Sequence, residues 1–244
     1  MMKRVVMMLM VVGLVSVSQA VLIDDFQGYT EAGSISDDTA GVWTEIGTSG
    51  NPDIADDGAG NLFITNYKNG GWPDQVGTYR SLGANAVANG QTVTLEFDMM
   101  AATNNHDMSF GLANGGDNTA WNDMEAYVTI KEGDVKLRGV DGGLGLGEVV
   151  ADDVIVAGQW HHFKLIVDTD VDNFDLYLDD ALLWTGAPFR NGVDVEDLDA
   201  VKLIGYGGVD GEVDYVAIDN ITLVPEPATM ALLGLGALVL RRKR

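Results

Sequence analysis

The chain has 244 residues, with 37 acidic and 14 basic side chains, a formal net charge of −23 and no cysteine. Such an acidic chain repels phosphate backbones and has no basic stripe interleaved with aromatic residues, which excludes nucleic-acid binding. The lack of cysteine excludes disulfide bonds and thiolate metal sites, and the 31 glycines argue against a helical bundle.

The first twenty residues have the layout of a secretory signal. Lys3-Arg4 precede a thirteen-residue apolar stretch over residues 5–17, and Ser18-Gln19-Ala20 places small residues before the expected cut. We therefore expect a signal peptide over residues 1–20, cleavage after Ala20 and export by the Sec machinery. The alternative is an uncleaved anchor, which the short apolar stretch disfavours.

Alternating apolar and polar residues recur through the body of the chain, residues 21–224. In residues 91–99, for example, Val93, Leu95 and Phe97 fall on one face of a strand, and Thr94 and Glu96 on the other. The same alternation continues in residues 160–167 and 174–178. Further strands are expected at residues 22–26, 61–66, 108–112, 126–131, 134–140, 148–156, 200–205 and 213–223.

Half-buried strands joined by short polar turns, without intervening helices, predict an all-β fold with two antiparallel sheets packed as a jelly-roll sandwich. The last strand changes phase, because Val216 and Ile218 are two apart but the next apolar residues are Ile221 and Leu223. A β-bulge near Asp219-Asn220 is expected there, since it keeps both pairs on the inner face.

Two segments carry a family resemblance. Residues 158–165, Gly-Gln-Trp-His-His-Phe-Lys-Leu, and residues 174–180, Phe-Asp-Leu-Tyr-Leu-Asp-Asp, resemble the hairpin of laminin-G-like and concanavalin-like lectin/glucanase sandwiches. The expected first and last strands, at residues 23–26 and 218–223, resemble those of exported members. One departure is Asp180, where the hairpin usually carries glycine. The resemblance implies a laminin-G/concanavalin-like sandwich over residues 21–224.

Catalytic signals are weak. Laminarinase-like members of this fold carry their carboxylates on one strand as E-x-D-x-x-E, and the sequence has no such motif. The nearest candidate is Asp123-Met124-Glu125, with two carboxylates on one face; its alternative interpretation is an acidic strand edge. No G-x-S-x-G occurs, and the adjacent His161 and His162 point to opposite faces of a strand. We expect a non-catalytic protein, with a polysaccharide hydrolase or lyase of the same fold as the alternative.

Two segments combine a tryptophan with amides and acids, the groups that bind sugar rings. Trp72 and Asp74 lie in residues 66–74, and Trp121 and Asn122 lie in residues 118–123. With His106, from an expected loop at residues 103–107, they are the carbohydrate-binding candidates. In the alternative interpretation the two tryptophans close the ends of the core.

The acidic body favours divalent cations, and a structural calcium ion is the expected cofactor. Asp168, Asp170 and Asp172 alternate as at the start of a calcium-binding loop, although the segment also reads as a plain hairpin turn. A second calcium candidate pairs Asp25, or Asp24, on the first strand with Asp219, or Asn220, on the last.

The last twenty residues have three parts: Pro225-Glu226-Pro227, a thirteen-residue apolar run over residues 228–240, and Arg241-Arg242-Lys243-Arg244. As a helix the run spans about 20 Å, against the roughly 30 Å of a bilayer core, so it is a marginal transmembrane helix. The basic residues would remain in the cytoplasm. The alternative is an ordinary helix packed on the body, although the run has no polar face.

These three parts resemble the PEP-CTERM sorting signal of Gram-negative bacteria, which implies recognition and processing by a membrane exosortase. The sequence therefore predicts three segments, at residues 1–20, 21–224 and 225–244. It predicts an exported cell-surface or extracellular-matrix protein that binds polysaccharide and is held in the membrane by its C-terminal helix until processing. A purely structural envelope protein is the further alternative.

Overall fold

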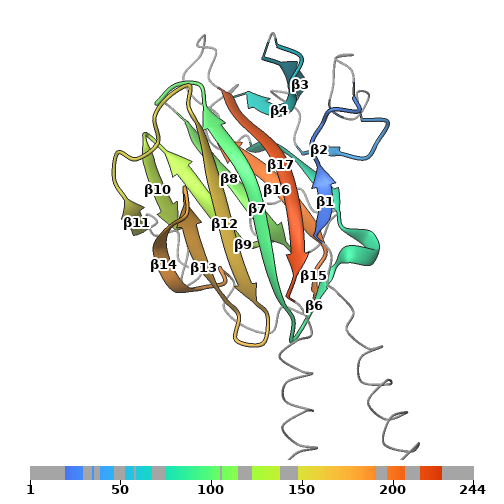
Figure 1. Cartoon of the computed structure of the whole chain (residues 1–244), viewed down its shortest axis with the longest axis vertical. Helices are drawn as coiled ribbons and strands as arrows, with labels where there is room; N and C mark the ends of the chain where they lie inside the picture. The colour runs from blue at the N-terminus through green and yellow to red at the C-terminus, as the bar shows by residue number, and fades with distance from the viewer. Residues whose placement is uncertain are drawn as a thin grey trace, which may run out of the picture.

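A computed structural model describes residues 20–29, 35, 39–46, 53–57, 59–67, 75–104, 106–114, 123–137, 148–190, 197–206 and 215–226. They form two large antiparallel sheets packed face to face (Figure 1), which confirms the predicted all-β sandwich. The apolar stretches expected at residues 5–17 and 228–240 lie outside these ranges. Within the described ranges, no helix combines the length and the apolar character that crossing a membrane requires.

The first sheet, sheet A, has eight strands. Its strands are β14 (Ala181–Pro188), β13 (Asn173–Leu178), β12 (Trp160–Asp168), β7 (Thr92–Ala101), β17 (Tyr215–Pro225), β4 (Leu62–Tyr67), β3 (Asp53–Asp56) and β1 (Val21–Asp24). The long strand β17 lies at the centre. It pairs with β7 along one side, and on its other side with β4 over residues 215–218 and with β1 over residues 221–223.

The second sheet, sheet B, has seven strands and lies behind sheet A in Figure 1. Its strands in order are β11 (Glu148–Ala151), β10 (Asp134–Leu137), β9 (Met124–Lys131), β8 (Asp107–Ala113), β16 (Ala200–Tyr206), β5 (Gln75–Ser81) and β2 (Thr44–Ile46). The short strands β6 (Val87–Ala88) and β15 (Asp197–Leu198) pair separately, and a 3₁₀ helix, η1 (Gly83–Asn85), precedes β6.

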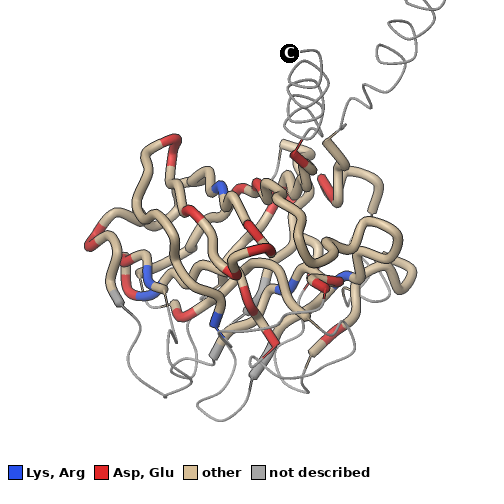
Figure 2. Tube along the Cα trace, turned by 90° about the horizontal axis from the view of Figure 1, so that it is seen from below, with Lys and Arg blue, Asp and Glu red and all other residues tan. Residues whose placement is uncertain are grey.

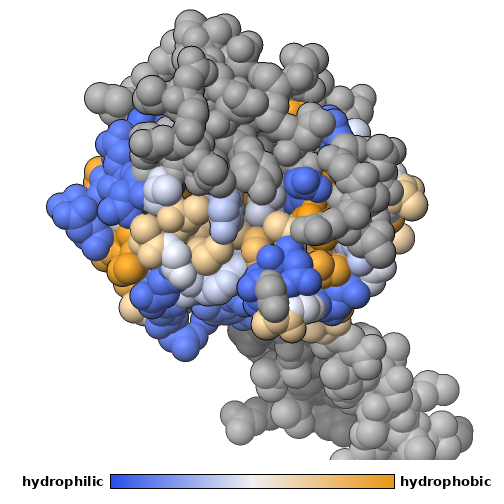
Figure 3. Space-filling model, turned by 90° about the horizontal axis from the view of Figure 1, so that it is seen from above, coloured by the Kyte–Doolittle hydropathy of each residue, from blue (hydrophilic) through white to orange (hydrophobic). Residues whose placement is uncertain are grey.

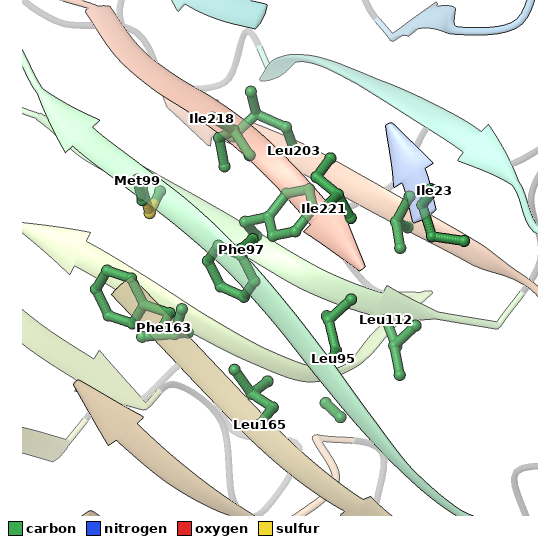
Figure 4. Packing of buried hydrophobic residues seen from close by; sticks show 14 of the residues in the cluster. Ile23, Leu95, Phe97, Met99, Leu112, Phe163, Leu165, Leu203, Ile218 and Ile221 are labelled. Atoms are coloured by element: carbon green, nitrogen blue, oxygen red, sulfur yellow. The ribbon is translucent and has the colours of Figure 1, made fainter. Parts of the chain in front are cut away.

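The core fills the space between the sheets. In β7 and β12 every second side chain is buried, as the alternation predicted. Phe97 of β7 stacks on Phe163 of β12 at 5.4 Å between ring centroids, and its ring meets the edge of Phe110 from sheet B at 4.5 Å. Leu112 and Leu203 of sheet B face these residues (Figure 4). Burial of such side chains contributes about 1.5–3 kcal/mol each.

The predicted bulge in β17 is confirmed. The register with β7 shifts between Asp219 and Thr222, and Asn220 adopts a left-handed φ of 52°. As a result Ile218 and Ile221 both point into the core (Figure 4). The bulge lies where the neighbour of β17 changes from β4 to β1, so the ends of these two strands meet beside Asp219.

The strand register also defines two ends of the sandwich. Val21 pairs with Leu223, and Pro225 pairs with Val93 near the start of β7; we call this the tail end. Tyr67 pairs with Tyr215 at the opposite end of β17, which we call the far end. In Figure 1 the tail end of sheet A is at the bottom, and β3 and β4 are at the top.

Candidate functional site

The two carboxylates proposed from sequence lie at the start of β9, and one of them contacts a buried lysine of sheet B. Val128 and Ile130 of β9 point into the core, but the register of β9 with β8 shifts between Ala126 and Met124, so this alternation does not extend to Asp123 and Glu125. Lys202 lies on the outer face of sheet B, because its neighbours Val201 and Leu203 point into the core. Lys202 of β16 is fully buried, and its Nζ lies 3.4 Å from Asp123 Oδ2. Glu125 is 4% exposed. We call Asp123, Glu125 and Lys202 the sheet B cluster.

A glycine separates Lys202 from Tyr127 on this face. Gly111 of β8 pairs with both residues, and a Cβ there would lie 2.2 Å from the carbonyl oxygen of Ala126. Only glycine therefore fits at this position without a shift of β9. The sheet B cluster combines one charge-neutralised carboxylate with one buried carboxylate, whereas a glycosidase needs two carboxyl groups that reach the glycosidic bond.

A second polar group lies on the outer face of sheet A, at the β17 bulge. The carboxylate of Asp219 is buried and accepts hydrogen bonds from Asn220 N at 2.7 Å and from Asn61 Nδ2 at 3.3 Å. Burial, with smaller contributions from the charges of Asp98 and Asp25, raises the pKa of Asp219 to about 6. The structure thus places Asp25 and Asp219 near each other, as expected of neighbouring first and last strands.

Hydrogen bonds continue from the bulge across sheet A. Asn220 Nδ2 donates to Asp98 Oδ2 at 2.8 Å, and His162 Nδ1 lies 2.8 Å from Asp98 Oδ1. The next carboxylate, Asp179, accepts from His162 N and lies 2.8 Å from His161 Nδ1. Although desolvation opposes the change, the bonds from His161 and from the His162 backbone lower the pKa of Asp179. As predicted, the two histidines occupy opposite faces: His161 is buried and His162 is half-exposed.

Asp24 of β1 is a structural centre rather than a surface ligand. Its buried carboxylate accepts hydrogen bonds from Phe26 N, Tyr29 OH and Trp43 Nε1 and forms an ion pair with Arg80. Burial and then the neighbouring Asp24 charge raise the pKa of Tyr29 to about 12. This carboxylate therefore joins β1 to the segment that follows it and to β5.

The calcium candidates Asp168, Asp170 and Asp172 lie in the turn between β12 and β13, at the tail end. Asp168 Oδ1 accepts from Asp170 N at 2.9 Å, and Asp172 has a left-handed φ of 52°. These features are those of a hairpin turn. Among the described residues, a group of three acidic side chains with ligand oxygens within 4.8 Å of one another is formed elsewhere, by Asp134, Asp152 and Asp153.

That group lies at the β10–β11 edge of sheet B. Asp134 Oδ1 accepts from Asp153 N at 3.1 Å, and Asp134 Oδ2 pairs with Lys136 Nζ at 3.0 Å. These contacts lower the pKa of Asp134, whereas the neighbouring Asp134 raises the pKa of Asp152. The group could hold a divalent cation.

Among the carbohydrate-binding candidates, the structure describes His106 alone. Trp72, Asp74, Trp121 and Asn122 lie outside the described residues, and His106 is 2% exposed with Nδ1 2.6 Å from Thr103 O. The strand ends that flank the two tryptophan segments can be compared. Gln75 pairs with Tyr206, whereas Ala113 pairs with Ala200 at the other end of β16. The two segments therefore leave sheet B at opposite ends.

The sorting residues begin within the fold. Pro225 is the last residue of β17, and Glu226 N donates to Thr92 O at 3.0 Å. Pro227, Arg241 and Arg242 lie outside the described residues. Residues 223–244 match the PEP-CTERM protein-sorting motif. The motif indicates export, sorting to the bacterial cell envelope and processing by an exosortase. No curated protein matches the sequence.

Solved structures with a similar fold include a sialidase and a Bacillus licheniformis β-glucanase. The sialidase gives a TM-score of 0.58 at 14% identity over 84% of this chain, but only 18% of the sialidase chain is covered. The β-glucanase gives 0.53 at 13% identity, covering 85% of this chain and 97% of its own. The expected jelly-roll sandwich is therefore confirmed as a fold.

Sequence reasoning missed Lys202 and the contacts of Asp24. The alternation in Val201-Lys202-Leu203 places Lys202 on the outer face of sheet B, so the sequence alone could have indicated this residue. Nothing local in the sequence indicates that the outer face of sheet B is buried, and pairing of Asp24 with Arg80 joins residues that are 56 positions apart.

Proposed function

We propose that this chain is an exported protein of the cell surface or extracellular matrix whose jelly-roll body binds polysaccharide without cleaving it. The observation that carries the proposal is the sorting motif joined directly to the last strand of a complete sandwich. In this proposal the Sec machinery exports the chain, its C-terminal segment holds it in the membrane, and an exosortase of a Gram-negative-type bacterium then processes the tail.

The sheet B cluster favours a binding role over catalysis. A general acid or base must come within hydrogen-bond distance of the atom that gains or loses the proton. Glu125 is buried, and Asp123 is engaged by Lys202, so neither is presented to a glycosidic oxygen. A hydrolase or lyase that uses Asp123 and Glu125 is the competing function.

The charge of the body favours a neutral polysaccharide. Acidic side chains are distributed over the whole described trace, and basic ones are few (Figure 2). An anionic polymer such as a polyuronate would be repelled by this surface. The far end, seen in Figure 3, presents hydrophilic and apolar residues side by side, the mixture that sugar rings require.

The test uses the exported, processed protein in two assays. A glycan array should give signals on neutral polysaccharides, and incubation with the same polysaccharides should release no reducing or unsaturated sugar ends. Release that disappears in Glu125→Gln would establish the enzyme instead. If the array gives no signals in buffers with or without calcium, a structural envelope protein would be the remaining candidate function.

We also propose a structural calcium ion, and the bulge in β17 is one candidate place for it. The supporting observation is Asp219, a buried carboxylate near two others, because a divalent cation offsets such repulsion. Calcium added to chelator-treated protein should raise the melting temperature of the wild type but not of Asp219→Asn. A higher melting temperature in both proteins would favour calcium at the acidic turn, residues 168–172, or at the Asp134 group. An unchanged melting temperature in both proteins would contradict the proposed calcium ion.

A further inference from the structure

Two aromatic rings meet over the outer face of sheet A. Ile64 and Phe163 point into the core, so alternation places Phe63 of β4 and Trp160 of β12 on the outer side. Their ring centroids are 5.4 Å apart, at an angle of 78° between the planes. Because β7 and β17 separate β12 from β4, the two backbones are about 14 Å apart. The rings therefore lean toward each other across these strands, and we call Phe63 and Trp160 the aromatic bridge.

The aromatic bridge covers small residues of the outer face. Ala217 of β17 pairs with Met100 of β7 and with Thr65 of β4, and both Ala217 and Thr65 are fully buried. Phe63 is 4% exposed, whereas Trp160 is only half-buried. The solvent-facing part of the aromatic bridge is therefore the indole of Trp160. Trp160 pairs with Met100, so it lies toward the far end.

Hydrogen-bonding side chains lie beside this indole on the same face. His162 follows Trp160 by two residues on β12 and is 43% exposed. Asp98 accepts from His162 Nδ1 and from Asn220 Nδ2, so the three side chains hold one another in place. The second ring nitrogen, Nε2, is on the opposite side of the imidazole from Asp98. The surface thus combines an indole, an imidazole, a carboxylate and an amide on three adjacent central strands.

We propose that this surface, formed by Trp160, His162, Asp98 and Asn220, is where the body binds a neutral polysaccharide. The inference rests on the proposed function and gives it a site. A pyranose ring has an apolar face that stacks on an indole and hydroxyl groups that bond to polar side chains at its edge. Because the groups are held on paired strands, the site is preformed. It lies on the opposite sheet from Glu125.

Tyr177 is a matched comparison on the same outer face. Leu176 and Leu178 of β13 point into the core, so Tyr177 lies on the outer side, where it pairs with Lys164. Lys164 Nζ is 4.3 Å from the centroid of the tyrosine ring. A sugar that stacked on that face would have to displace the cation. We therefore expect Tyr177 to make little contribution to binding.

The test is titration of the exported, processed protein with the polysaccharides that give array signals. Trp160→Ala should weaken binding about tenfold, the cost of one lost aromatic contact. His162→Ala should weaken it about threefold or more, because one hydrogen bond is lost. Tyr177→Ala is the control and should leave the dissociation constant unchanged. Melting temperatures are measured for all three variants, since Trp160→Ala also removes the contact with Phe63.

Each other outcome contradicts the site. Unchanged binding in both Trp160→Ala and His162→Ala would overturn the inference while the proposed function stands. Weaker binding in Trp160→Ala alone, together with a lower melting temperature, would show that the aromatic bridge only supports the fold. An equal loss in Tyr177→Ala would show that binding does not depend on this surface in particular. An array without signals would remove the proposed function, and the site with it.

Discussion

Asp24 shows how one buried carboxylate organises the start of the body. It receives donors from three residues that follow it within twenty positions, and from Arg80. We predict that Asp24→Asn lowers the free energy of unfolding by about 3 kcal/mol, because it leaves Arg80 without its counter-charge and turns an acceptor into a donor. Denaturant unfolding measures the change. Asp170→Asn, at an exposed position, is the control and should change stability by less than about 0.5 kcal/mol.

Asp219 makes stability depend on pH in an unusual direction. Its folded pKa of about 6 lies above the value of an unfolded aspartate, so the folded state binds the proton more tightly. Stability from this residue is present below about pH 4 and is lost as the pH rises through 6. The advantage of Asp219→Asn over the wild type, in calcium-free buffer, should grow by about 2–3 kcal/mol from pH 4 to pH 7. A pH-independent difference between the two unfolding free energies would contradict this assignment.

The surroundings of Asp219 show which features the local sequence predicts and which it does not. The phase change in Val216, Ile218, Ile221 and Leu223 predicted the bulge, and the bulge is what buries Asp219. The partners of Asp219 were not predictable. Asn61 and Asp98 reach it only because β4 and β7 flank β17, and strand order is a property of the whole sheet.

The turn between β13 and β14 is the element in which the sequence departs from the hairpin it resembles. Asp179 and Asp180 have φ values of 47° and 66°, the left-handed conformations of a type I′ turn. Glycine adopts such angles without strain, so Asp180→Gly should raise the free energy of unfolding by roughly 0.5–1 kcal/mol. Thermal and denaturant unfolding of the exported protein measure the gain.

The neighbouring residue provides the matched control. Asp179 has the same backbone strain, but its carboxylate bonds both His161 and the backbone of His162. Asp179→Gly should therefore lose stability even though the strain is relieved. Equal effects of the two substitutions would show that the turn conformation, and not the side-chain contacts, controls this hairpin.

Among the strands, alternation predicted those with one buried face, and strands buried on both faces, such as β8 and β16, were also predicted within two residues of their ends. β7, β12 and β13 were predicted within two residues of their ends, because a strictly alternating apolar and polar pattern indicates a strand with one buried face. β5 contains Gly77 and polar residues on both faces, and β14 is an edge strand without alternation that ends in Pro188. Neither was predicted. β11 ends at Ala151, short of the expected residue 156, because the chain turns at Asp152 and Asp153.

At the scale of the whole molecule, the two tryptophan segments can be distinguished by position. Residues 68–74 connect Tyr67, at the far end, to Gln75, whereas residues 115–122 follow Ala113, which is level with Ser81 and Ala200 toward the tail end. In the proposed export, the tail end faces the membrane until processing, and the far end is presented to the surrounding matrix. We therefore predict that Trp72→Ala weakens polysaccharide binding at least about tenfold, the cost of one aromatic contact of about 1.4 kcal/mol.

Trp121→Ala is the control in the same binding assay and should have a much smaller effect. The reverse order would place the binding surface near the tail end and contradict the proposed presentation. Both variants are compared by titration of the polysaccharides that give array signals, with melting temperatures measured to exclude loss of folding.

The central place of β17 in sheet A also sets the order of events during biosynthesis. This strand is the last part of the body to be translated, yet β7, β4 and β1 all form ladder bonds with it. In the proposed export, a nascent chain that lacks β17 would leave sheet A open and stay in a form that a translocation pore can thread. Completion of the fold would then coincide with arrival of the C-terminal apolar run, which in the proposed export is the segment that holds the chain in the membrane.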